Sequence, residues 1–428
     1  MAVRGAVTRK YIFDPVHGPI ELSGLSLALV GHPLVQRLWG IRQTGLAQLV
    51  FPGANHTRLE HSLGVLFLAR AMSEAMELPE REAHAISIAG LLHDLGHTPY
   101  SHTLEPVLRE LTGRSHEDMT RALVEGEPLA GFRSLGERLS GSPSEELPTL
   151  LERHGIPPRE LSRLLGPQRE GGKPYVGEML HGAIDADRVD YLERDARYTG
   201  VGPGIIDAHR LLETARRVDG HLAFEEKGRA AVEGFLLARS LMYSSVYYNK
   251  TVRIAEMMLQ GAVERWPGAR SEPWYAWTDG DLLCRLKTSE GVPGELARRL
   301  EVRQLYKRVA TLDRTDAPFR ELSRLVRDPA ARRAWEEELS SRLRARPGEL
   351  LIDLAQALPV SASPRSRRPP DPVWVLRNGQ RRDLYRDDPI WAAWALRPVV
   401  PWAAAMYVSP RLRRSASTRA TRWLGDPP

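Results

Sequence analysis

The chain of 428 residues contains a single cysteine, Cys284. One thiol cannot form an internal disulfide or a zinc site built from several cysteines, and this scarcity fits a reducing compartment. Aromatic residues make up only 7% of the chain, and we find no internal repeat. The first ten residues lack the apolar segment of an export signal, so we expect a cytoplasmic protein.

The chain also lacks an uninterrupted apolar stretch of membrane-spanning length. The most apolar run, residues 390–408, is interrupted by Arg397, Pro398 and Pro401. A membrane-spanning helix needs about 20 consecutive apolar residues. We therefore predict a buried, tryptophan-rich packing segment here and no membrane partner.

Basic residues exceed acidic ones, which gives a net charge of +6 and a pI near 9.5. Arginines cluster late in the chain, at residues 365–368 and 411–422. Such clusters either form a solvated face or contact the phosphates of a nucleotide or nucleic acid. Both interpretations stay open, so nucleic-acid binding is neither required nor excluded.

The spacing of apolar residues predicts a mainly α fold. Apolar residues recur at three- and four-residue steps over most of the first 265 residues, a pattern typical of amphipathic helices. The expected helices cover residues 33–44, 57–77, 80–95, 104–112, 116–123, 148–165, 176–197 and 230–264. In the last of these, Arg239, Tyr243 and Tyr247 are spaced four residues apart and should share one face.

The pattern changes after Trp266, and short strand-like segments appear. Asn378-Gly379 separates two strand-like runs, and this dipeptide supplies the positive φ angles of a type I′ hairpin turn. We therefore divide the chain into a helical core (1–265), a helical extension (266–347) and a smaller, basic, mixed α/β region with a β-hairpin (348–428).

The most informative stretch follows the apolar run 85–92. It contains His93-Asp94, a turn with Gly96 and Pro99, and then His97 and His102. A His-Asp pair alone is more often a hydrogen-bonded core pair. Three histidines within ten residues, in a chain with only 13, instead favour a site for a divalent cation, which imidazole and carboxylate ligands suit.

Two further segments complete a pattern. His61 lies upstream in residues 55–64, and Asp187 lies downstream in residues 184–195. The ordered series resembles the H…HD…D pattern of the HD-domain phosphohydrolases. Within that family the chain resembles the deoxynucleoside triphosphate (dNTP) triphosphohydrolases, a branch that includes the sterile-alpha-motif HD protein of animals. Residues 13–20, 36–38, 51–61, 93–102 and 185–195 carry this narrower resemblance, which is strong over about residues 10–255.

The resemblance implies that residues 1–265 form an HD-domain helical core with one metal site. Its ligands would be His61, His93, Asp94 and Asp187. Two imidazoles and two carboxylates leave room for water or a phosphate oxygen, as a catalytic metal site requires. Without thiolate ligands, Mn, Fe, Mg, Zn and Ni all remain candidates.

The resemblance also implies catalytic and substrate-binding roles. His116 would be the general acid, assisted by His97 and Glu105. The implied substrate-binding residues are Gln43, Arg58, His102, Arg188, Tyr191, Asp195, Arg239, Tyr243, Tyr247 and Lys250.

Within this set, Arg58, Arg188 and Arg239 match phosphate contacts, and Lys250 adds a further cation on the same long predicted helix as Arg239. Gln43 and Asp195 match residues that read the sugar 3′-hydroxyl. Tyr247 matches the residue that packs under the sugar and disfavours a 2′-hydroxyl. Read singly, each of these residues would be an ordinary surface or packing residue.

The implied activity converts a dNTP and water to a deoxynucleoside and inorganic triphosphate, in dNTP pool control or phage defence. Relatives act as oligomers, so we expect a homo-oligomer, a dimer or tetramer. Gly31, Trp39 and Phe13 depart from the guanine-effector contacts of the animal enzyme, so another nucleotide effector, or none, is expected. The alternatives are an HD phosphohydrolase or phosphodiesterase acting on another nucleotide, or a catalytically idle regulator that binds nucleotides or nucleic acid.

Overall fold

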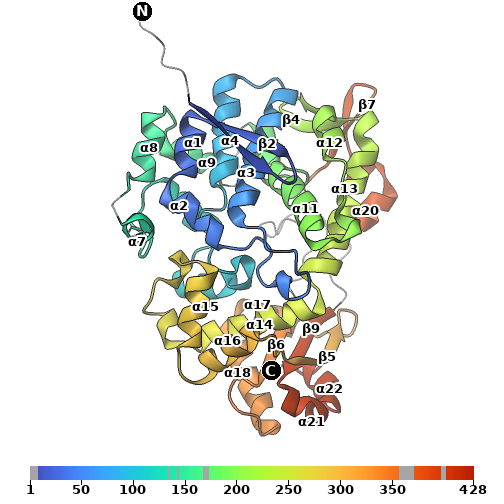
Figure 1. The fold of residues 1–428 in the computed structure, drawn as a ribbon. Coiled ribbons are helices and arrows are strands. Elements are labelled where there is room, and N and C mark those ends of the chain that lie inside the picture. The colour runs from blue at the N-terminus through green and yellow to red at the C-terminus, as the bar shows by residue number, and fades with distance from the viewer. Residues whose placement is uncertain (1–7, 134, 142–143, 167–172, 356–370, 397–401) are drawn as a thin grey trace, which may run out of the picture.

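The computed structural model describes residues 8–133, 135–141, 144–166, 173–355, 371–396 and 402–428. As predicted, the chain is mainly helical, with small sheets (Figure 1). Among the described residues, no helix has both the length and the apolar character needed to cross a bilayer. The arginines at 365–368 and the interruptions at Arg397, Pro398 and Pro401 lie outside the described residues.

An antiparallel hairpin opens the described chain. It consists of β1 (Arg9–Asp14) and β2 (Gly18–Ser23), and α1 (Gly24–Val30) and α2 (Pro33–Gln36) follow it. The helix predicted over 33–44 is wrong beyond Gly40, because Ile41 adopts an extended conformation. The Gln43 N–H donates to the carbonyl of His56 at 3.0 Å. Gln43 is thereby held beside the segment that leads into the next helix.

Three helices form the centre of the molecule. They are α3 (Arg58–Ala75), α4 (Glu80–Leu92) and α11 (Ala186–Thr199), and α3 packs against both of the others. A capping box between Thr57 and Glu60 starts α3. A Cβ on Gly64 would lie 1.8 Å from Asp190 Oδ1, so only glycine allows α3 and α11 to approach this closely.

Shorter helices surround this centre. Their bounds are α5 (Glu105–Thr112), α6 (His116–Val124), α7 (Leu135–Ser140), α8 (Leu147–Arg153), α9 (Pro158–Leu164), α10 (Pro174–His181) and α12 (Ala208–Thr214). The single helix predicted over 176–197 is wrong, because a non-helical segment separates α10 from α11. Gly182 is extended, and the Asp185 side chain caps α11 by accepting from the Arg188 N–H at 2.7 Å.

The helix predicted over 230–264 is also interrupted. It consists of α13 (Arg229–Met242), a π-helical turn (Tyr243–Tyr247) and α14 (Lys250–Glu264). The Asn249 side chain caps α14 by accepting from the Thr251 N–H at 2.9 Å. Lys250 therefore begins a new helix, and its predicted place on the same helix as Arg239 is wrong.

The C-terminal part combines helices with two sheets. Its helices are α15 (Asp279–Lys287), α16 (Gly291–Glu301), α17 (Phe319–Arg327), α18 (Pro329–Arg342), α19 (Leu384–Asp387), α20 (Pro389–Ala395), α21 (Arg413–Ser417) and α22 (Ala420–Leu424). One sheet has the order β5-β9-β6, with β5 (Lys307–Asp313), β9 (Trp402–Val408) and β6 (Leu350–Leu354) antiparallel. Every residue of β9 is buried, which confirms the predicted packing segment over residues 402–408. The prediction is wrong over residues 390–396, because α20 lies at the surface with Ile390 76% and Leu396 71% exposed.

The predicted hairpin is present as β7 (Trp374–Arg377) and β8 (Gln380–Asp383). Asn378 and Gly379 have φ angles of 51° and 74°, as a type I′ turn requires. In sequence, however, we did not expect its partners, β3 (Ala215–Val218) and β4 (His221–Glu225). The sheet order is β3-β4-β7-β8, so the hairpin extends a sheet that begins within residues 1–265. The division at 265 and 347 stays a prediction.

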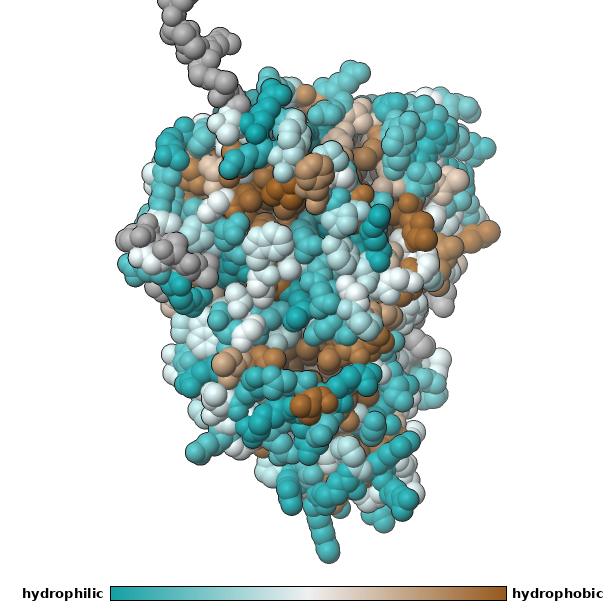
Figure 2. Space-filling view, in the orientation of Figure 1, coloured by the Kyte–Doolittle hydropathy of each residue, from teal (hydrophilic) through white to brown (hydrophobic). Residues whose placement is uncertain are grey.

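The space-filling view shows a mostly hydrophilic surface with small apolar patches (Figure 2). The exposed large apolar side chains include Phe13, at 81% exposure, and Ile390. Scattered exposure of this kind is normal for a folded protein. The buried core is extensive, and one cluster runs from Ile20 in the first hairpin to Tyr407 in β9.

Candidate active site

The structure brings the four proposed metal ligands together from three helices. His61 lies in α3, His93 and Asp94 follow α4, and Asp187 lies in the first turn of α11. His61 Nε2 lies 3.1 Å from Asp187 Oδ1 and 3.8 Å from Asp94 Oδ2. His93 Nε2 lies 3.1 Å from Asp94 Oδ1 and 3.8 Å from Asp187 Oδ1.

The donor set fits a divalent cation. The Nε2 atoms of His61 and His93 are buried and have no hydrogen-bond partner among the residues that the structure describes. The other ring nitrogens are engaged, with His61 Nδ1 2.7 Å from Asp190 Oδ2 and His93 Nδ1 2.7 Å from the Gly90 carbonyl. Because a carbonyl only accepts, His93 Nδ1 carries a hydrogen and donates it, which leaves Nε2 as the ring nitrogen that could bind a cation.

The charges of this cluster also favour a bound divalent cation. Burial lowers the pKa of His61, but the adjacent carboxylates of Asp187 and Asp190 outweigh burial and raise that pKa to about 10. Burial raises the pKa of Asp187, yet His61 and His93 hold it below its usual range. The carboxylates therefore attract positive charge to this point, and a cation held by the nitrogen lone pairs would satisfy them in place of a proton.

A second layer of buried residues fixes His61. Asp190 contacts His17 Nε2 at 2.6 Å and accepts from Arg194 Nε at 2.8 Å. Arg194 also donates to Asp14 at 2.7 Å, which ties the first hairpin to the metal cluster. These four residues were not predicted as contributors, although they lie within the matched segments 13–20 and 185–195. A carboxylate one helical turn after Asp187 would have been the available signal.

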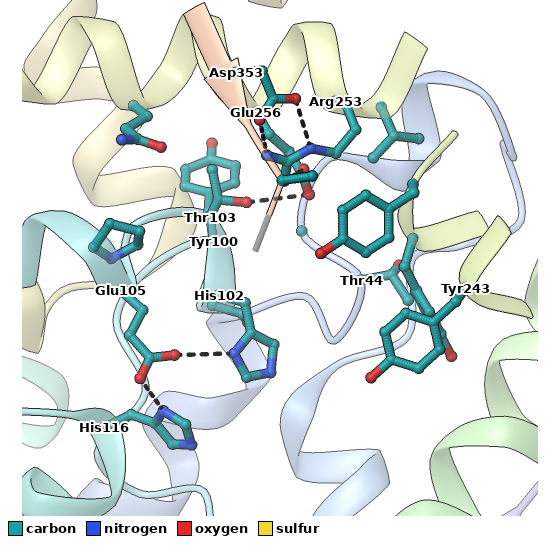
Figure 3. Close-up of a pocket in the computed structure, with 18 of the residues that line it drawn as sticks. Thr44, Tyr100, His102, Thr103, Glu105, His116, Tyr243, Arg253, Glu256 and Asp353 are labelled. Atoms are coloured by element: carbon teal, nitrogen blue, oxygen red, sulfur yellow. Dashed lines mark hydrogen bonds and ion pairs between the residues drawn. The ribbon is translucent and has the colours of Figure 1, made fainter. Parts of the chain in front are cut away.

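Beside the metal ligands lies a cluster of His97, His102 and His116, and Figure 3 shows His102 and His116 in contact with Glu105. Glu105 Oε1 lies 3.1 Å from His116 Nδ1, and Oε2 lies 3.2 Å from His102 Nδ1. The rings of His97 and His116 stack at 3.9 Å, and His97 Nε2 lies 3.3 Å from Asp94 Oδ1. The cluster therefore adjoins the metal ligands directly.

The protonation of this cluster follows from its contacts. Burial raises the pKa of Glu105, but His116 and His102 outweigh burial and hold that pKa well below its usual range. Burial and the nearby Arg58 and His116 lower the pKa of His97. Glu105 therefore carries its negative charge beside His116 Nδ1 and His102 Nδ1.

Backbone packing holds these histidines in place. A Cβ on Gly96 would lie 2.1 Å from the His116 carbonyl oxygen, so this glycine lets the turn after His93 pack against α6. The Arg37 guanidinium donates to the carbonyls of Leu95 and His97 at 2.9 and 2.7 Å. Arg37 lies in segment 36–38, which carries the family resemblance, but it was not predicted as a site residue.

Arginines line the adjoining cleft, which has a volume of about 1150 Å³. Arg58 is 2% exposed and donates to Asp94 Oδ2 at 2.5 Å and to Ser101 Oγ at 2.6 Å, while its Nη2 is buried without a hydrogen-bond partner. Arg188 donates to the Gly182 carbonyl, and Arg239 lies 5.6 Å from the ring centre of Tyr243. Lys250 is exposed and is not among the lining residues, so the structure does not place it with the arginines.

The remaining predicted residues lie on one side of the same cleft. Tyr247 donates to Asp195 Oδ2 at 2.5 Å, and the Tyr243 and Tyr191 rings lie 5.2 and 6.2 Å from the Tyr247 ring. Gln43 also lines the cleft, and its Oε1 is buried without a partner.

The sequence analysis missed His56 as a contributor to this side of the cleft. His56 Nε2 lies 2.7 Å from Asp195 Oδ1, so His56 orients the carboxylate that Tyr247 contacts from the other side. His56 stands five residues before His61 in the matched stretch 51–61. That position was its only sequence signal.

Comparisons with known proteins agree with this geometry. The HD domain model matches residues 58–195, and the HD associated region model matches residues 206–424. An uncharacterised protein of Methanocaldococcus jannaschii is 34% identical over 309 residues, which cover 71% of this chain and 60% of that protein. The bovine (Bos taurus) deoxynucleoside triphosphate triphosphohydrolase SAMHD1 is 32% identical over 281 residues, which cover 60% of this chain and 47% of that protein.

Two solved structures resemble the whole chain. A hypothetical protein of Aquifex aeolicus superposes with a TM-score of 0.68 at 28% identity, covering 96% of this chain and 100% of that one. A phosphohydrolase of Bacteroides thetaiotaomicron superposes with a TM-score of 0.67 at 25% identity, covering 94% and 100%. The chain spans about half to three fifths of the length of the curated relatives that it matches. The two matched regions together extend from Arg58 to Leu424, and the chain therefore belongs to the HD-domain phosphohydrolase family that carries the HD associated region.

Proposed function

We propose that the chain is a metal-dependent dNTP triphosphohydrolase that converts a dNTP and water to a deoxynucleoside and inorganic triphosphate. One observation carries the proposal. The free Nε2 atoms of His61 and His93 adjoin a cleft that three buried arginines line. Similarity to proteins named as dNTP triphosphohydrolases, at 28 to 32% identity, supports the substrate class.

His61, His93, Asp94 and Asp187 would hold the cation, whose identity among Mn, Fe, Mg, Zn and Ni stays open. When bound, it neutralises phosphate charge and makes a water more acidic. Asp190 keeps the His61 ring oriented, since it occupies Nδ1. The Gly90 carbonyl does the same for His93.

Three guanidinium groups supply the charge that a triphosphate needs. Arg58 keeps one unpartnered Nη2, and the backbone carbonyl of Gly182 orients Arg188. Arg239 comes from α13, so the three cations arrive from separate elements. Guanidinium groups bind phosphate oxygens through paired, charge-assisted hydrogen bonds.

The leaving 5′-oxygen requires a proton. His116 is the proposed donor, because it borders the cleft and Glu105 holds its Nδ1. His102 shares the same carboxylate and borders the cleft, and the stacked ring of His97 supports His116. General acids of this kind typically contribute about 10²- to 10⁴-fold to rate.

The sugar would lie against Tyr247, with Asp195 and Gln43 near the 3′-hydroxyl and Tyr191 and Tyr243 beside them. Tyr247 is fixed by its bond to Asp195, and Asp195 is held by His56. A tyrosine ring restrained in this way would give the sugar a fixed surface and leave little room for a 2′-hydroxyl. This arrangement supports deoxyribose over ribose.

A homo-oligomer, a nucleotide effector distinct from guanine and a cytoplasmic location also remain proposals. The oligomer rests on the resemblance to oligomeric relatives, and light scattering with and without dNTPs measures it. The same resemblance leaves pool control and phage defence as alternative roles.

The proposal is tested by product analysis. The full chain is incubated with each dNTP and each ribonucleoside triphosphate in Mn or Mg, and products are separated by chromatography. We expect deoxynucleoside and intact triphosphate, with activity lost in Asp187→Ala and retained in Glu110→Gln, a charge-matched change at the cleft rim. Release of monophosphate or orthophosphate would instead indicate an HD phosphohydrolase with another reaction, and nucleotide binding without turnover would indicate a regulator.

A further inference from the structure

The far end of the cleft contains a buried ionic cluster that no step above uses. Arg253 and Glu256 lie one turn apart on α14, and Asp353 lies on β6. Arg253 donates to the two Asp353 oxygens at 3.1 and 2.7 Å, and its Nη1 donates to Glu256 Oε2 at 2.6 Å. Figure 3 shows this cluster across the cleft from His102 and His116.

The cluster is continuous with the proposed substrate site on two sides. Thr103 follows His102 in the chain, and its Oγ1 lies 3.4 Å from Glu256 Oε1. On the other side, the Tyr243 ring lies 6.3 Å from the Tyr248 ring, which lies 5.5 Å from the Arg253 guanidinium. Aromatic rings therefore connect the proposed sugar site to Arg253 and Glu256.

The geometry of a nucleotide brings its base to this end. The base and the 5′-phosphates leave opposite ends of the sugar ring. With the phosphates at the arginines and the sugar on Tyr247, the base extends along Tyr248 toward Glu256. Aromatic side chains suit this path, because the face of any base can stack on them.

Glu256 has acceptor capacity to spare. A carboxylate offers about four lone-pair positions. Within the described part of the chain, its Oε2 accepts one short bond from Arg253, and its Oε1 accepts only the long bond from Thr103. Burial raises the pKa of Glu256, although Arg253 acts in the opposite direction. Asp353 is more fully engaged, since Tyr407 also donates to it at 3.0 Å.

A carboxylate discriminates among bases by its lone pairs. Guanine presents two adjacent N–H donors, at N1 and the 2-amino group, and one carboxylate accepts both. Adenine and cytosine place a ring-nitrogen lone pair beside their amino group, and thymine places carbonyls on both sides of N3–H. Each of these would set a lone pair against the carboxylate.

We propose, on the basis of the proposed function, that Glu256 reads the base and makes the site prefer a guanine deoxynucleotide. Arg253 and Asp353 are positioning residues that hold Glu256 toward the cleft. Thr44 also lines the cleft, and its buried, unpartnered Oγ1 can donate to the guanine 6-oxygen.

The experiment compares kcat/KM for dGTP, dITP, dATP, dCTP and dTTP in the wild type, Glu256→Gln and Glu110→Gln. We expect the wild type to prefer dGTP over dTTP by about tenfold to a hundredfold, as one paired hydrogen bond to a base supplies. Deoxyinosine triphosphate lacks the 2-amino group and should fall between them. Glu256→Gln turns an amide donor toward two donors, so its dGTP preference should fall to about threefold or less while dTTP turnover is retained.

Three results would overturn the inference. Equal kcat/KM values for dGTP and dITP in the wild type would overturn the inference without any variant. Unchanged ratios of kcat/KM among the dNTPs in Glu256→Gln would also overturn it. An equal loss of activity on every dNTP would overturn it too, because Glu256 would then support the structure rather than contact the base. In each case turnover of dNTPs by the wild type leaves the proposed function standing, whereas absence of all dNTP turnover removes the proposed function itself. Glu110→Gln should leave the base ratios at wild-type values.

Discussion

Replacing Asp190 with asparagine tests how the chain prepares His61 for a metal. Asp190 is fully buried, and four contacts within 3.0 Å converge on its two oxygens, from His61, His17 and twice from Arg194. An amide keeps the size of the side chain but removes its charge. In either orientation of the amide, its NH2 group replaces one carboxylate oxygen. That NH2 group then faces hydrogen-bond donors that the oxygen accepted from.

The magnitude follows from these contacts. Loss of a carboxylate that orients a ligating histidine costs about 10- to 100-fold in metal affinity, which corresponds to about 1.4 to 2.7 kcal/mol. The metal-free protein should also lose stability, because Arg194 becomes partly unpaired in the core. Breaking a buried ion pair costs about 3–5 kcal/mol, and we expect the lower end, since Asp14 still accepts from Arg194.

The assay measures metal affinity directly, by competition with a chelator and elemental analysis, together with urea unfolding of the metal-free protein. Glu193→Gln is the matched control, since it removes the same charge from the same helix, α11, outside the His61 contacts. Metal affinity in Asp190→Asn that stays within about twofold of the wild type would refute the reasoning.

Three further predictions test other parts of the structure. Gly64→Ala should cost about 1–3 kcal/mol in urea unfolding and lower metal content, because its Cβ would meet Asp190; equal stability would contradict the packing between α3 and α11. Ser115→Ala should cost about 1 kcal/mol and slow turnover, because Ser115 caps the helix that begins at His116; a loss seen equally in Thr278→Ala, which caps the distant α15, would confine the turnover effect to stability. Burial raises the pKa of Asp279 to about 6, so its ionisation destabilises the folded chain and stability should fall by up to about 3 kcal/mol as pH rises from about 4 to 6; Asp279→Asn should remove that slope, and an unchanged slope in urea titrations would contradict the assignment.

The motif residues were the most predictable part of the site. His61, His93-Asp94 and Asp187 stand in ordered segments, and tertiary packing of α3, α4 and α11 brings them together. The long central helices were predictable for a similar reason, since their periodic apolar residues report directly on burial.

Local interruptions were not predictable from periodicity. Asp185 and Asn249 are N-caps that begin new helices inside stretches whose apolar spacing continues unbroken. The second interruption separates Lys250 from Arg239, and so removed a phosphate contact that the continuous helix implied. The pairing of β4 with β7 joins residues about 150 positions apart, and alternation within single strands does not reveal a partner at that distance.

The residues that orient the site residues from behind were also not predicted from the sequence. Asp190, His17 and His56 act through other side chains, so they needed the three-dimensional contacts to be recognised. In sequence they are ordinary polar residues within matched segments.

Isotope labelling of the products tests the central claim most directly. The full chain is incubated with a dNTP in ¹⁸O-labelled water with Mn or Mg, and the ¹⁸O content of each product is measured by mass spectrometry. Attack at the α-phosphorus predicts one ¹⁸O atom in inorganic triphosphate and none in the deoxynucleoside. Label in a deoxynucleoside monophosphate, in orthophosphate or in the deoxynucleoside would contradict the account.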